Sequence, residues 1–187
     1  MRWFHKLQRQ YSLLLVTSIV TGLASCQNSG YYITPPGQTF SGTLNTIVRE
    51  GGANFSHDGR YLVFHSDRNS QRSIYLYDLQ SSRLVNLPGL NKPGSMQFDA
   101  DLSADGRYIV YVSEELGKTD IFVYDRAALN SENITKNLIG EVRNPTISGN
   151  GRLVAFESNR NGQWDVEIYD RGLTTDLSLP KEEQGNK

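Results

Sequence analysis

Ser103-Ala-Asp-Gly-Arg-Tyr-Ile-Val-Tyr-Val-Ser113 decides the fold, because closely similar segments stand at two other places in the chain. These are Ser56-His-Asp-Gly-Arg-Tyr-Leu-Val-Phe-His-Ser66 and Ser148-Gly-Asn-Gly-Arg-Leu-Val-Ala-Phe-Glu-Ser158. Each is followed by a second matching segment, which reads Ser73-Ile-Tyr-Leu-Tyr-Asp78, Asp120-Ile-Phe-Val-Tyr-Asp125 or Asp165-Val-Glu-Ile-Tyr-Asp170. The equivalent glycines, Gly59, Gly106 and Gly151, stand 47 and 45 residues apart, as do the three closing aspartates. The chain therefore contains three tandem repeats.

The composition of the repeats predicts short antiparallel strands. The repeated segments are rich in Tyr, Val, Ile and Phe and adjoin Asp-Gly or Asn-Gly turns, and no spacing of three and four is sustained. In the first repeat we predict one strand entering Ser56 and others over 61–66, 74–77 and 83–87, with the same plan in the other two. A period in the forties with several strands per unit is typical of propeller blades. We predict an all-β, β-propeller-like fold with three recognisable four-stranded blades. The sequence does not determine how these blades close into a ring.

The strand Tyr61-Leu-Val-Phe64 is apolar on both faces, since successive side chains point to opposite sides and none of the four is charged. Such a strand must be covered on both sides. Radially stacked blades provide that cover, because each sheet packs against the one before it and the one after it. We therefore expect Leu62, Ile109 and Val154 to be buried.

Three sets of repeated polar residues are interpreted as parts of the scaffold. Glycine, aspartate and asparagine tolerate the positive φ of tight turns, and an aspartate at a strand end can accept hydrogen bonds from the following backbone N–H groups. We expect Arg60, Arg107 and Arg152 to pair with nearby carboxylates rather than form an anion-binding ring. The predicted repeat turns are Asp58, Gly59, Asp105, Gly106, Asn150 and Gly151, and the predicted strand-end turns start at Asp78, Asp125 and Asp170.

The first 26 residues have the order of a bacterial secretory signal. Three basic residues precede an uncharged apolar run over 11–22, which is short for a membrane span of about 20 residues. The run ends at Leu23-Ala-Ser-Cys26, which resembles the lipobox of bacterial lipoproteins. This resemblance implies removal of residues 1–25 and acylation of Cys26, the only cysteine, for which no disulfide partner exists within the chain. Several acyl chains anchor a protein far more firmly than one.

These features predict the organisation of the chain. A signal peptide over 1–25 is followed by a flexible tether over 26–40, a propeller domain over 41–180 and a disordered tail over 181–187. The repeats within the domain run over about 51–90, 98–140 and 143–180. Three blades leave two apolar faces bare, so we expect either that end strands over Thr43–Val48 and Asp176–Leu179 cap the arc or that two chains pair into a six-bladed ring.

Charge excludes nucleic acid as a partner. Three of the 19 basic residues and none of the 20 acidic residues lie in 1–25, so the exported part has 16 basic residues against 20 acidic ones and a formal net charge of −4. It contains no basic tract of the kind that binds a phosphate backbone.

The repeat pattern resembles a known family. Ser-x-Asp-Gly-Arg-x-Leu/Ile-x-Phe/Tyr-x-Ser, followed by an Ile-Tyr-x-Tyr-Asp type of strand, is similar to the WD40-like, PD40-type β-propeller repeat of TolB and of the prolyl oligopeptidase propellers. The resemblance covers about residues 51–171. His57, Ala104 and Gly149 replace the proline that usually precedes Asp-Gly in that family. A TolB-like protein is expected to have an amino-terminal domain ahead of a six-bladed propeller, whereas this sequence shows three repeats. The resemblance therefore implies the fold more than an equivalent role.

Catalysis and metal binding find little support. Ser56-His57-Asp58 contains the residue types of a hydrolase triad, but triad members come from separate parts of a chain, and Ala104 and Gly149 replace the histidine in the other repeats. The histidines show no ligand spacing, and the segments 67–69 and 159–162, which loosely resemble calcium loops, are expected to be turns. We expect no enzymatic activity, no cofactor and no metal.

The sequence favours a non-catalytic binding module, lipid-anchored in the cell envelope and TolB-like. The partner would be an envelope protein or a cell-wall polymer, contacted by the variable segments Pro88–Asp99 and Leu129–Gly140. A small glycan-active enzyme or lyase on a propeller scaffold, and a purely structural lipoprotein, are the alternatives. An aspartate directly after the lipidated cysteine would resemble an inner-membrane retention signal, and Gln27 occupies that position here. In a cell with two membranes, the outer membrane, facing the periplasm, is therefore favoured.

Overall fold

The computed structural model describes residues 43–173, which contain eleven β-strands and no helix. The chain divides into two units, Met1–Ile33 and Thr34–Lys187, and all described residues belong to the second. The expected signal peptide, tether and tail, with Cys26 and the strand expected over Asp176–Leu179, lie outside the described residues.

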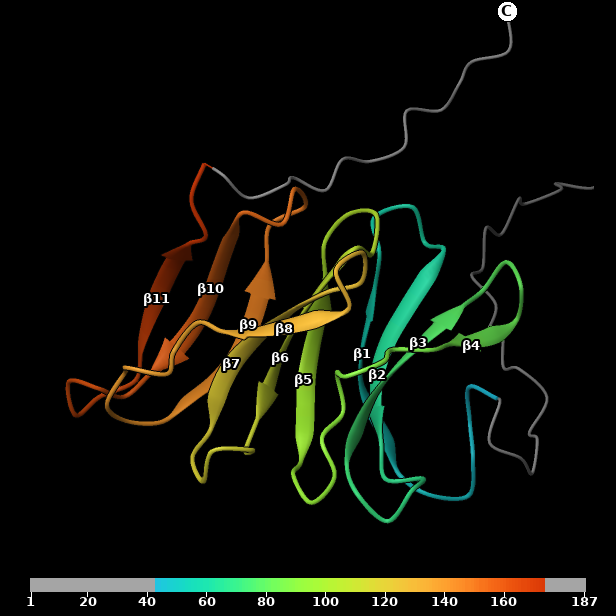
Figure 1. Ribbon diagram of the computed structural model, residues 1–187, viewed down its shortest axis with the longest axis horizontal. Coiled ribbons are helices and arrows are strands. Elements are labelled where there is room, and N and C mark those ends of the chain that lie inside the picture. The colour runs from blue at the N-terminus through green and yellow to red at the C-terminus, as the bar shows by residue number, and fades with distance from the viewer. Residues whose placement is uncertain (1–42, 174–187) are drawn as a thin grey trace, which may run out of the picture. The chain divides into compact units, whose positions relative to one another are not determined.

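The strands form three antiparallel sheets that follow one another along the chain (Figure 1). Sheet 1 consists of β1 (Glu50–Phe55), β2 (Tyr61–Ser66), β3 (Ser73–Asp78) and β4 (Arg83–Val85). Sheet 2 consists of β5 (Gln97–Leu102), β6 (Tyr108–Ser113), β7 (Asp120–Asp125) and β8 (Asn130–Asn133). Sheet 3 consists of β9 (Val142–Ile147), β10 (Leu153–Ser158) and β11 (Asp165–Asp170). The predicted all-β class and blade-like meanders are confirmed, with three strands of the third blade within the described residues.

One strand prediction is wrong. Thr43–Val48 forms no strand, and the first strand begins at Glu50. The Arg68 guanidinium donates hydrogen bonds to the main-chain oxygens of Thr43 and Leu44, at 2.9 and 3.0 Å. The Arg68 side chain thus supplies the hydrogen bonds that a neighbouring strand would otherwise give to these two carbonyls. Ile47 is exposed, so this apolar residue does not pack against a sheet.

The middle strand of each sheet explains how the sheets stack. Leu62, Ile109 and Val154 are buried, as predicted, and every residue of β6 is buried on both faces. We call the side that meets the following sheet the forward face and the side that meets the preceding sheet the back face. Two apolar cores result, one between sheets 1 and 2 and one between sheets 2 and 3.

The two cores use alternate residues of the same strands. Val63 and Leu76, on the forward face of sheet 1, share a core with Ile109 and Tyr124 on the back face of sheet 2. The forward face of sheet 2 packs with sheet 3 in the same way, through Val110, Val112, Ile121 and Val123 against Val154 and Phe156. Full burial of one such aliphatic side chain contributes about 1.5–3 kcal/mol, so sheet 2 is stabilised from both sides.

A recurring three-residue contact joins neighbouring sheets, and we call it the Tyr–Gly–Arg joint. At the first joint, the Arg126 guanidinium lies 4.6 Å from the ring centroid of Tyr61 and donates to the Gly106 carbonyl at 2.8 Å. At the second, Arg171 lies 4.2 Å from the ring centroid of Tyr108 and donates to the Gly151 carbonyl at 2.7 Å. The tyrosine ring comes so close to the glycine that no side chain fits between them.

Paired arginines and aspartates hold the ends of each central hairpin. Arg60 contacts Asp78 at 2.9 Å, and Arg107 and Arg152 contact Asp125 and Asp170 at 3.0 and 2.7 Å. The hydrogen bond from Arg152 lowers the pKa of Asp170 to about 2. The hydrogen bond from Arg60 likewise lowers the pKa of Asp78. The charged form of each aspartate is therefore the form that the folded chain favours.

The three turn glycines give a graded test of the stacking. All have positive φ, at 67°, 70° and 78° for Gly59, Gly106 and Gly151. An alanine Cβ would meet nothing at Gly59, but would lie 2.8 Å from Tyr61 at Gly106 and 2.3 Å from Tyr108 at Gly151. Gly59→Ala should lower the free energy of unfolding by about 1–2 kcal/mol through backbone strain alone. Gly106→Ala and Gly151→Ala should each cost about 1–3 kcal/mol more through overpacking, with Gly151→Ala the worst.

Urea unfolding of the three variants measures this order. Gly59→Ala is the matched control, because it changes the same position of the repeat without a neighbouring ring. Equal losses at all three positions would show that the rings do not press on the glycines.

Candidate functional site

The innermost strand of each sheet carries a β-bulge at the same point. The pairing register shifts between Gly51 and Asn54 in β1, between Phe98 and Asp101 in β5, and opposite the Ala155–Glu157 stretch in β9. Gly52, Asp99 and Asn144 occupy the bulges with φ of 61°, 49° and 50°. Glycine, aspartate and asparagine are the residues that best tolerate this left-handed conformation. The bulges therefore re-aim the inner strands at three equivalent places.

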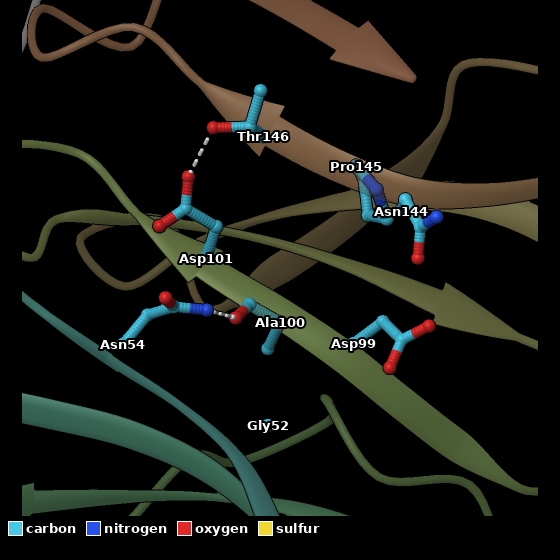
Figure 2. A pocket seen from close by; sticks show the side chains of 8 residues that line it. All are labelled: Gly52, Asn54, Asp99, Ala100, Asp101, Asn144, Pro145 and Thr146. Carbon is cyan, nitrogen blue, oxygen red and sulfur yellow. Dashed lines mark hydrogen bonds between the residues drawn. The ribbon is translucent and has the colours of Figure 1, made fainter. Parts of the chain in front are cut away.

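A cavity of about 360 Å³ lies between these strands (Figure 2). β1, β5 and β9 each contribute residues from the bulge and the positions beside it. The lining is mainly polar and includes two carboxylates, two carboxamides and one hydroxyl. Its residues are Gly52, Asn54, Asp99, Ala100, Asp101, Asn144, Pro145 and Thr146.

Two of the lining side chains join one sheet to the next. The Asn54 side-chain amide donates to the Ala100 carbonyl at 2.8 Å, linking sheets 1 and 2. The Asp101 carboxylate accepts from the Thr146 hydroxyl at 2.6 Å and from the backbone N–H of Ile147 at 3.0 Å, linking sheets 2 and 3. Asn54, Asp101 and Thr146 are equivalent positions of the three repeats. This row of polar groups therefore has a structural role.

Asp99 differs from its neighbours in the cavity. Among residues 43–173, no group donates a hydrogen bond to its carboxylate and no salt bridge forms with it, although Arg72 and His65 lie near enough to interact with it electrostatically. Figure 2 shows it without the links drawn for Asp101 and Asn54. Asn144, the equivalent residue of the third sheet, donates to Glu157 at 3.0 Å. The cavity therefore presents one carboxylate whose hydrogen-bonding capacity is unused by the described part of the chain.

A buried histidine lies behind the first bulge. The His65 imidazole packs against Gly51 and Gly52, where added Cβ atoms would lie 3.0 and 2.9 Å from its ring nitrogens. Burial lowers the pKa of His65, so the neutral ring is favoured. Its Nδ1 is buried without a hydrogen-bond partner in the described structure. The paired glycines thus make room for this ring at the wall of the cavity.

The turn residues singled out from the sequence lie away from the cavity. In each repeat a serine hydroxyl donates to the carboxylate or carboxamide two residues later, at 2.7, 3.1 and 2.8 Å. That oxygen also accepts the backbone N–H of the following arginine. The residues Asp58, Asp105 and Asn150 thus close the loop before the middle strand.

The same geometry places Ser56, His57 and Asp58 in a turn. The Ser56 hydroxyl donates to Asp58 rather than to an imidazole. His57 is exposed, and its backbone N–H donates to the Ala104 carbonyl at 3.0 Å. The three side chains therefore lack the arrangement in which a histidine activates a serine.

The strand-end aspartates lie at the ends of β3, β7 and β11. Asp78 accepts from the backbone N–H groups of Gln80 and Ser81, and Asp125 accepts from Ala127 and Ala128. Asp170 accepts from Gly172 at 2.9 Å. Each also receives the arginine described above, so both oxygens have structural partners.

The variable segments occupy the connections between sheets. Pro88–Asp99 leads from sheet 1 into β5, and its residues Gly94, Ser95 and Met96 line a second cavity of about 520 Å³. Leu129–Gly140 contains β8 and the connection to β9. The first segment thus ends at Asp99, and the structure brings only that residue of it into the cavity between the bulges.

The segments that resemble calcium loops are hairpin loops. Asp67 pairs with Arg72 at 3.0 Å, and the Asn159 side chain accepts the backbone N–H of Glu141 at 2.8 Å. Within residues 43–173, no three His, Cys, Asp or Glu side chains group as a metal site would require.

Asn54, Asp99, Asp101 and Asn144 were missed as site residues by sequence reasoning. A signal was present, because Gly52, Asp99 and Asn144 stand 47 and 45 residues apart, the period of the repeat. Three residues tolerant of positive φ at that period would have indicated the bulges, although not the cavity between them.

Comparisons with known proteins extend the fold assignment. No family model and no curated protein matches the chain. Among solved structures, TolB from Acinetobacter baumannii superposes with a TM-score of 0.57 at 20% identity, over 70% of this chain and 32% of that one. A putative TolB from Agrobacterium tumefaciens gives 0.55 at 23% identity, over 69% and 47%. A puromycin-hydrolysing peptidase of Mycobacterium tuberculosis gives 0.51 at 15%, over 72% and 20%.

Because the identities are low, these similarities show a propeller-type fold alone. This chain spans less than half the length of each of these three proteins. Within the described residues, no helix is long and apolar enough to span a membrane.

The two carboxylates of the cavity should differ in their effect on stability. Asp101→Asn removes a charged acceptor of two inter-sheet hydrogen bonds and should lower the free energy of unfolding by about 1–2 kcal/mol. Asp99→Asn keeps the residue tolerant of positive φ and removes no described bond, so it should leave stability unchanged. Thermal and urea unfolding measure both, and an equal loss in the two variants would contradict the assignment of Asp101.

Proposed function

We propose that this chain is a non-catalytic binding module, lipid-anchored in the cell envelope, that recognises a protein or cell-wall polymer through the cavity between its inner strands. The observation that carries the proposal is the unpaired carboxylate of Asp99 in a polar cavity built from equivalent positions of three sheets. A rigid scaffold with one unused charged group is suited to recognition.

The chemistry of the lining indicates what the cavity accepts. Asp99 supplies a negative charge, and the carboxamide of Asn54 and the backbone at the bulges add polar groups around it. An ammonium or guanidinium group would pair with Asp99 and complete its hydrogen bonds. We therefore propose a partner segment that carries a lysine, an arginine or a free amino group.

Binding rather than catalysis is proposed because the repeated reactive groups are engaged in the scaffold. The Ser56 hydroxyl bonds to Asp58, and Asp78, Asp125 and Asp170 pair with arginines. Asp101 bonds to the neighbouring sheet. These groups already have partners that hold the turns and sheets together.

The proposed envelope location rests on the first 27 residues of the sequence. Basic residues, an apolar run and Leu23-Ala-Ser-Cys26 stand in the order of a lipoprotein signal. Acyl chains on Cys26 would hold the module at a membrane without any contribution from its sheets. Gln27 favours the outer membrane, facing the periplasm, in a cell with two membranes.

Lipid attachment is tested by growing cells with labelled palmitate. The natural chain should incorporate the label and lose residues 1–25, whereas Cys26→Ala should carry no label. Ser25→Ala is the matched control, because it keeps a small residue before the cysteine and should still be labelled. Label in the Cys26→Ala chain would contradict the anchor at this residue.

The binding role is tested with the immobilised chain from residue 27 onward and envelope extract or soluble cell-wall fragments as the source of partners. The natural chain should retain a specific component in a salt-sensitive manner, because an ion pair at Asp99 is screened by salt. Asp99→Asn should lose it while keeping its unfolding free energy.

Glu132→Gln serves as the charge-matched control, since Glu132 lies exposed on β8, away from the cavity. It should retain the same component as the natural chain. Equal retention by Asp99→Asn, or no specific component from either source, would contradict the proposal.

A further inference from the structure

The first repeat has a histidine beside its bulge where the other two repeats have a valine and a glutamate. His65, Val112 and Glu157 stand 47 and 45 residues apart and belong to β2, β6 and β10. In the register of sheet 1, His65 pairs with Gly51. Val112 and Glu157 likewise pair with the residue just before the bulge in β5 and β9. Each of these side chains therefore lies next to the bulge of its own sheet.

The three side chains leave the bulges in three different states. The Glu157 carboxylate accepts a hydrogen bond from Asn144 at 3.0 Å, so the carboxamide of the third bulge is engaged. The Val112 side chain has no polar atom to offer Asp99, the residue of the second bulge. His65 is the one of the three whose charge changes near neutral pH. The first bulge therefore adjoins a group that can be neutral or positive.

His65 lies close to the cavity that contains Asp99. Val63 packs against sheet 2, and His65, two residues further along β2, points to the same side of the sheet. His65 is 8% exposed, and its ring packs against Gly52, which lines the cavity. Asp99 lines the same cavity from β5 (Figure 2). The imidazole therefore lies behind one wall of the cavity into which the Asp99 bulge opens.

Two adjacent glycines make room for this ring. A Cβ at Gly51 or Gly52 would lie 3.0 or 2.9 Å from the ring nitrogens, so a side chain at either position would press on the imidazole. The equivalent positions of the other bulges carry Phe98–Asp99 and Arg143–Asn144. No described group bonds to the buried Nδ1 of His65, so packing alone holds that side of the ring. The first bulge is thus built around a histidine.

Burial and four charged groups act on the His65 imidazole. Burial is the largest influence and lowers the pKa of His65. The guanidiniums of Arg72 and Arg49 also oppose the protonated ring, whereas the carboxylates of Asp99 and Asp67 favour it. Asp67 pairs with Arg72 at 3.0 Å, which lowers the pKa of Asp67 and raises that of Arg72, so both keep their charges while His65 titrates.

The influence between Asp99 and His65 acts in both directions. A cation bound to Asp99 neutralises the carboxylate that favours the imidazolium, so it makes protonation of His65 harder. An imidazolium at His65 in turn makes binding of that cation less favourable by the same factor, because a coupling free energy between two sites is reciprocal. The affinity of the cavity for a cation must therefore rise with pH through the range in which His65 loses its proton.

We propose that His65 controls the Asp99 cavity, so that a cationic group binds there while the imidazole is neutral and is released when the imidazole takes up a proton. This regulation rests on the proposed function, because the cation is the ligand proposed for the same cavity. Release occurs below the ordinary histidine pKa of about 6.5, since burial favours the neutral ring. At neutral pH the cavity is therefore in its binding state.

The coupling is tested without a ligand, by following the histidine signals in NMR spectra of the chain from residue 27 onward as the pH changes. The described sheets belong to the unit Thr34–Lys187, and this form contains two histidines, so His57→Gln identifies the signal of His65. Asp99→Asn should lower the pKa of His65 by about 0.5 or more, a threefold change in proton affinity, because a charge that favours the imidazolium is lost. The control Glu132→Gln removes an exposed charge on β8 and should leave it unchanged.

Release is tested with the peptide Gly-Lys-Gly, blocked at both ends so that its side-chain ammonium is its only charge. Binding is followed through the backbone amide signals of the cavity, at a pH well above and a pH well below the midpoint measured for His65. The natural chain should bind the peptide about threefold more weakly at the lower pH, the factor that reciprocal coupling requires. His65→Gln should lose this difference, whereas His57→Gln, at an exposed histidine, should keep it.

Failure of this regulation can be told apart from failure of the proposed function. A His65 pKa that is the same with and without the Asp99 charge overturns the regulation, as does an equal loss of peptide binding in the natural and His65→Gln chains. Loss of the sheet signal in circular dichroism on protonation of His65 also overturns it, because the cavity itself would then be lost. A natural chain that binds the peptide at neither pH contradicts the cation proposed for Asp99, and the release with it, even where the titration shows the coupling.

The titration also covers the case in which His65→Gln does not fold. The comparison of Asp99→Asn with Glu132→Gln keeps the histidine in place, so it decides the coupling without that variant.

Discussion

The structure depends on the contact between sheets that are apolar on both sides. A strand such as β6, with all six residues buried, cannot lie at the surface of a lone sheet, because its alternate side chains would leave one apolar side in water. Neighbouring sheets remove both sides from water, and the Tyr–Gly–Arg joints fix the distance at which they do so. Within the described residues, the same constraint singles out Val166 and Ile168 of sheet 3, which are exposed where the equivalent residues of sheet 2 are buried.

The candidate site follows from how the stacked sheets meet at their inner strands. Three bulges at the repeat period turn Gly52, Asp99 and Asn144 toward one cavity, and the sheets are linked there by Asn54 and Asp101. Of the two carboxylates that line this cavity, Asp101 bonds to the neighbouring sheet, which leaves Asp99 as the distinctive group. The recognition that we propose at that point would require no movement of the sheets, since the bulge already holds the carboxylate in place.

Sequence reasoning identified the strands of the repeats because each depends on local features. Apolar runs such as Tyr108–Val112 and turn pairs such as Asp105-Gly106 have the same meaning wherever they stand. It was wrong for Thr43–Val48, where an apolar stretch has no strand beside it and Arg68 takes the carbonyls at its start. It overlooked the inner strands as a site, because Asp99 and Asp101 are the same residue type two positions apart, and only the structure shows that Asp99 lies in the bulge while Asp101 bonds to the next sheet.

The sequence by itself determined the repeat, its period of 47 and 45 residues, the all-β class and the burial of Leu62, Ile109 and Val154, because backbone tolerance and alternating burial are properties of neighbouring residues. Only the tertiary structure decided that Asp101 bonds to Thr146 while Asp99 bonds to no described group, and that Leu79 and Leu153 are partly exposed. Those distinctions arise from groups some 45 residues apart being brought within hydrogen-bonding or van der Waals distance, which depends on how one sheet lies on the next.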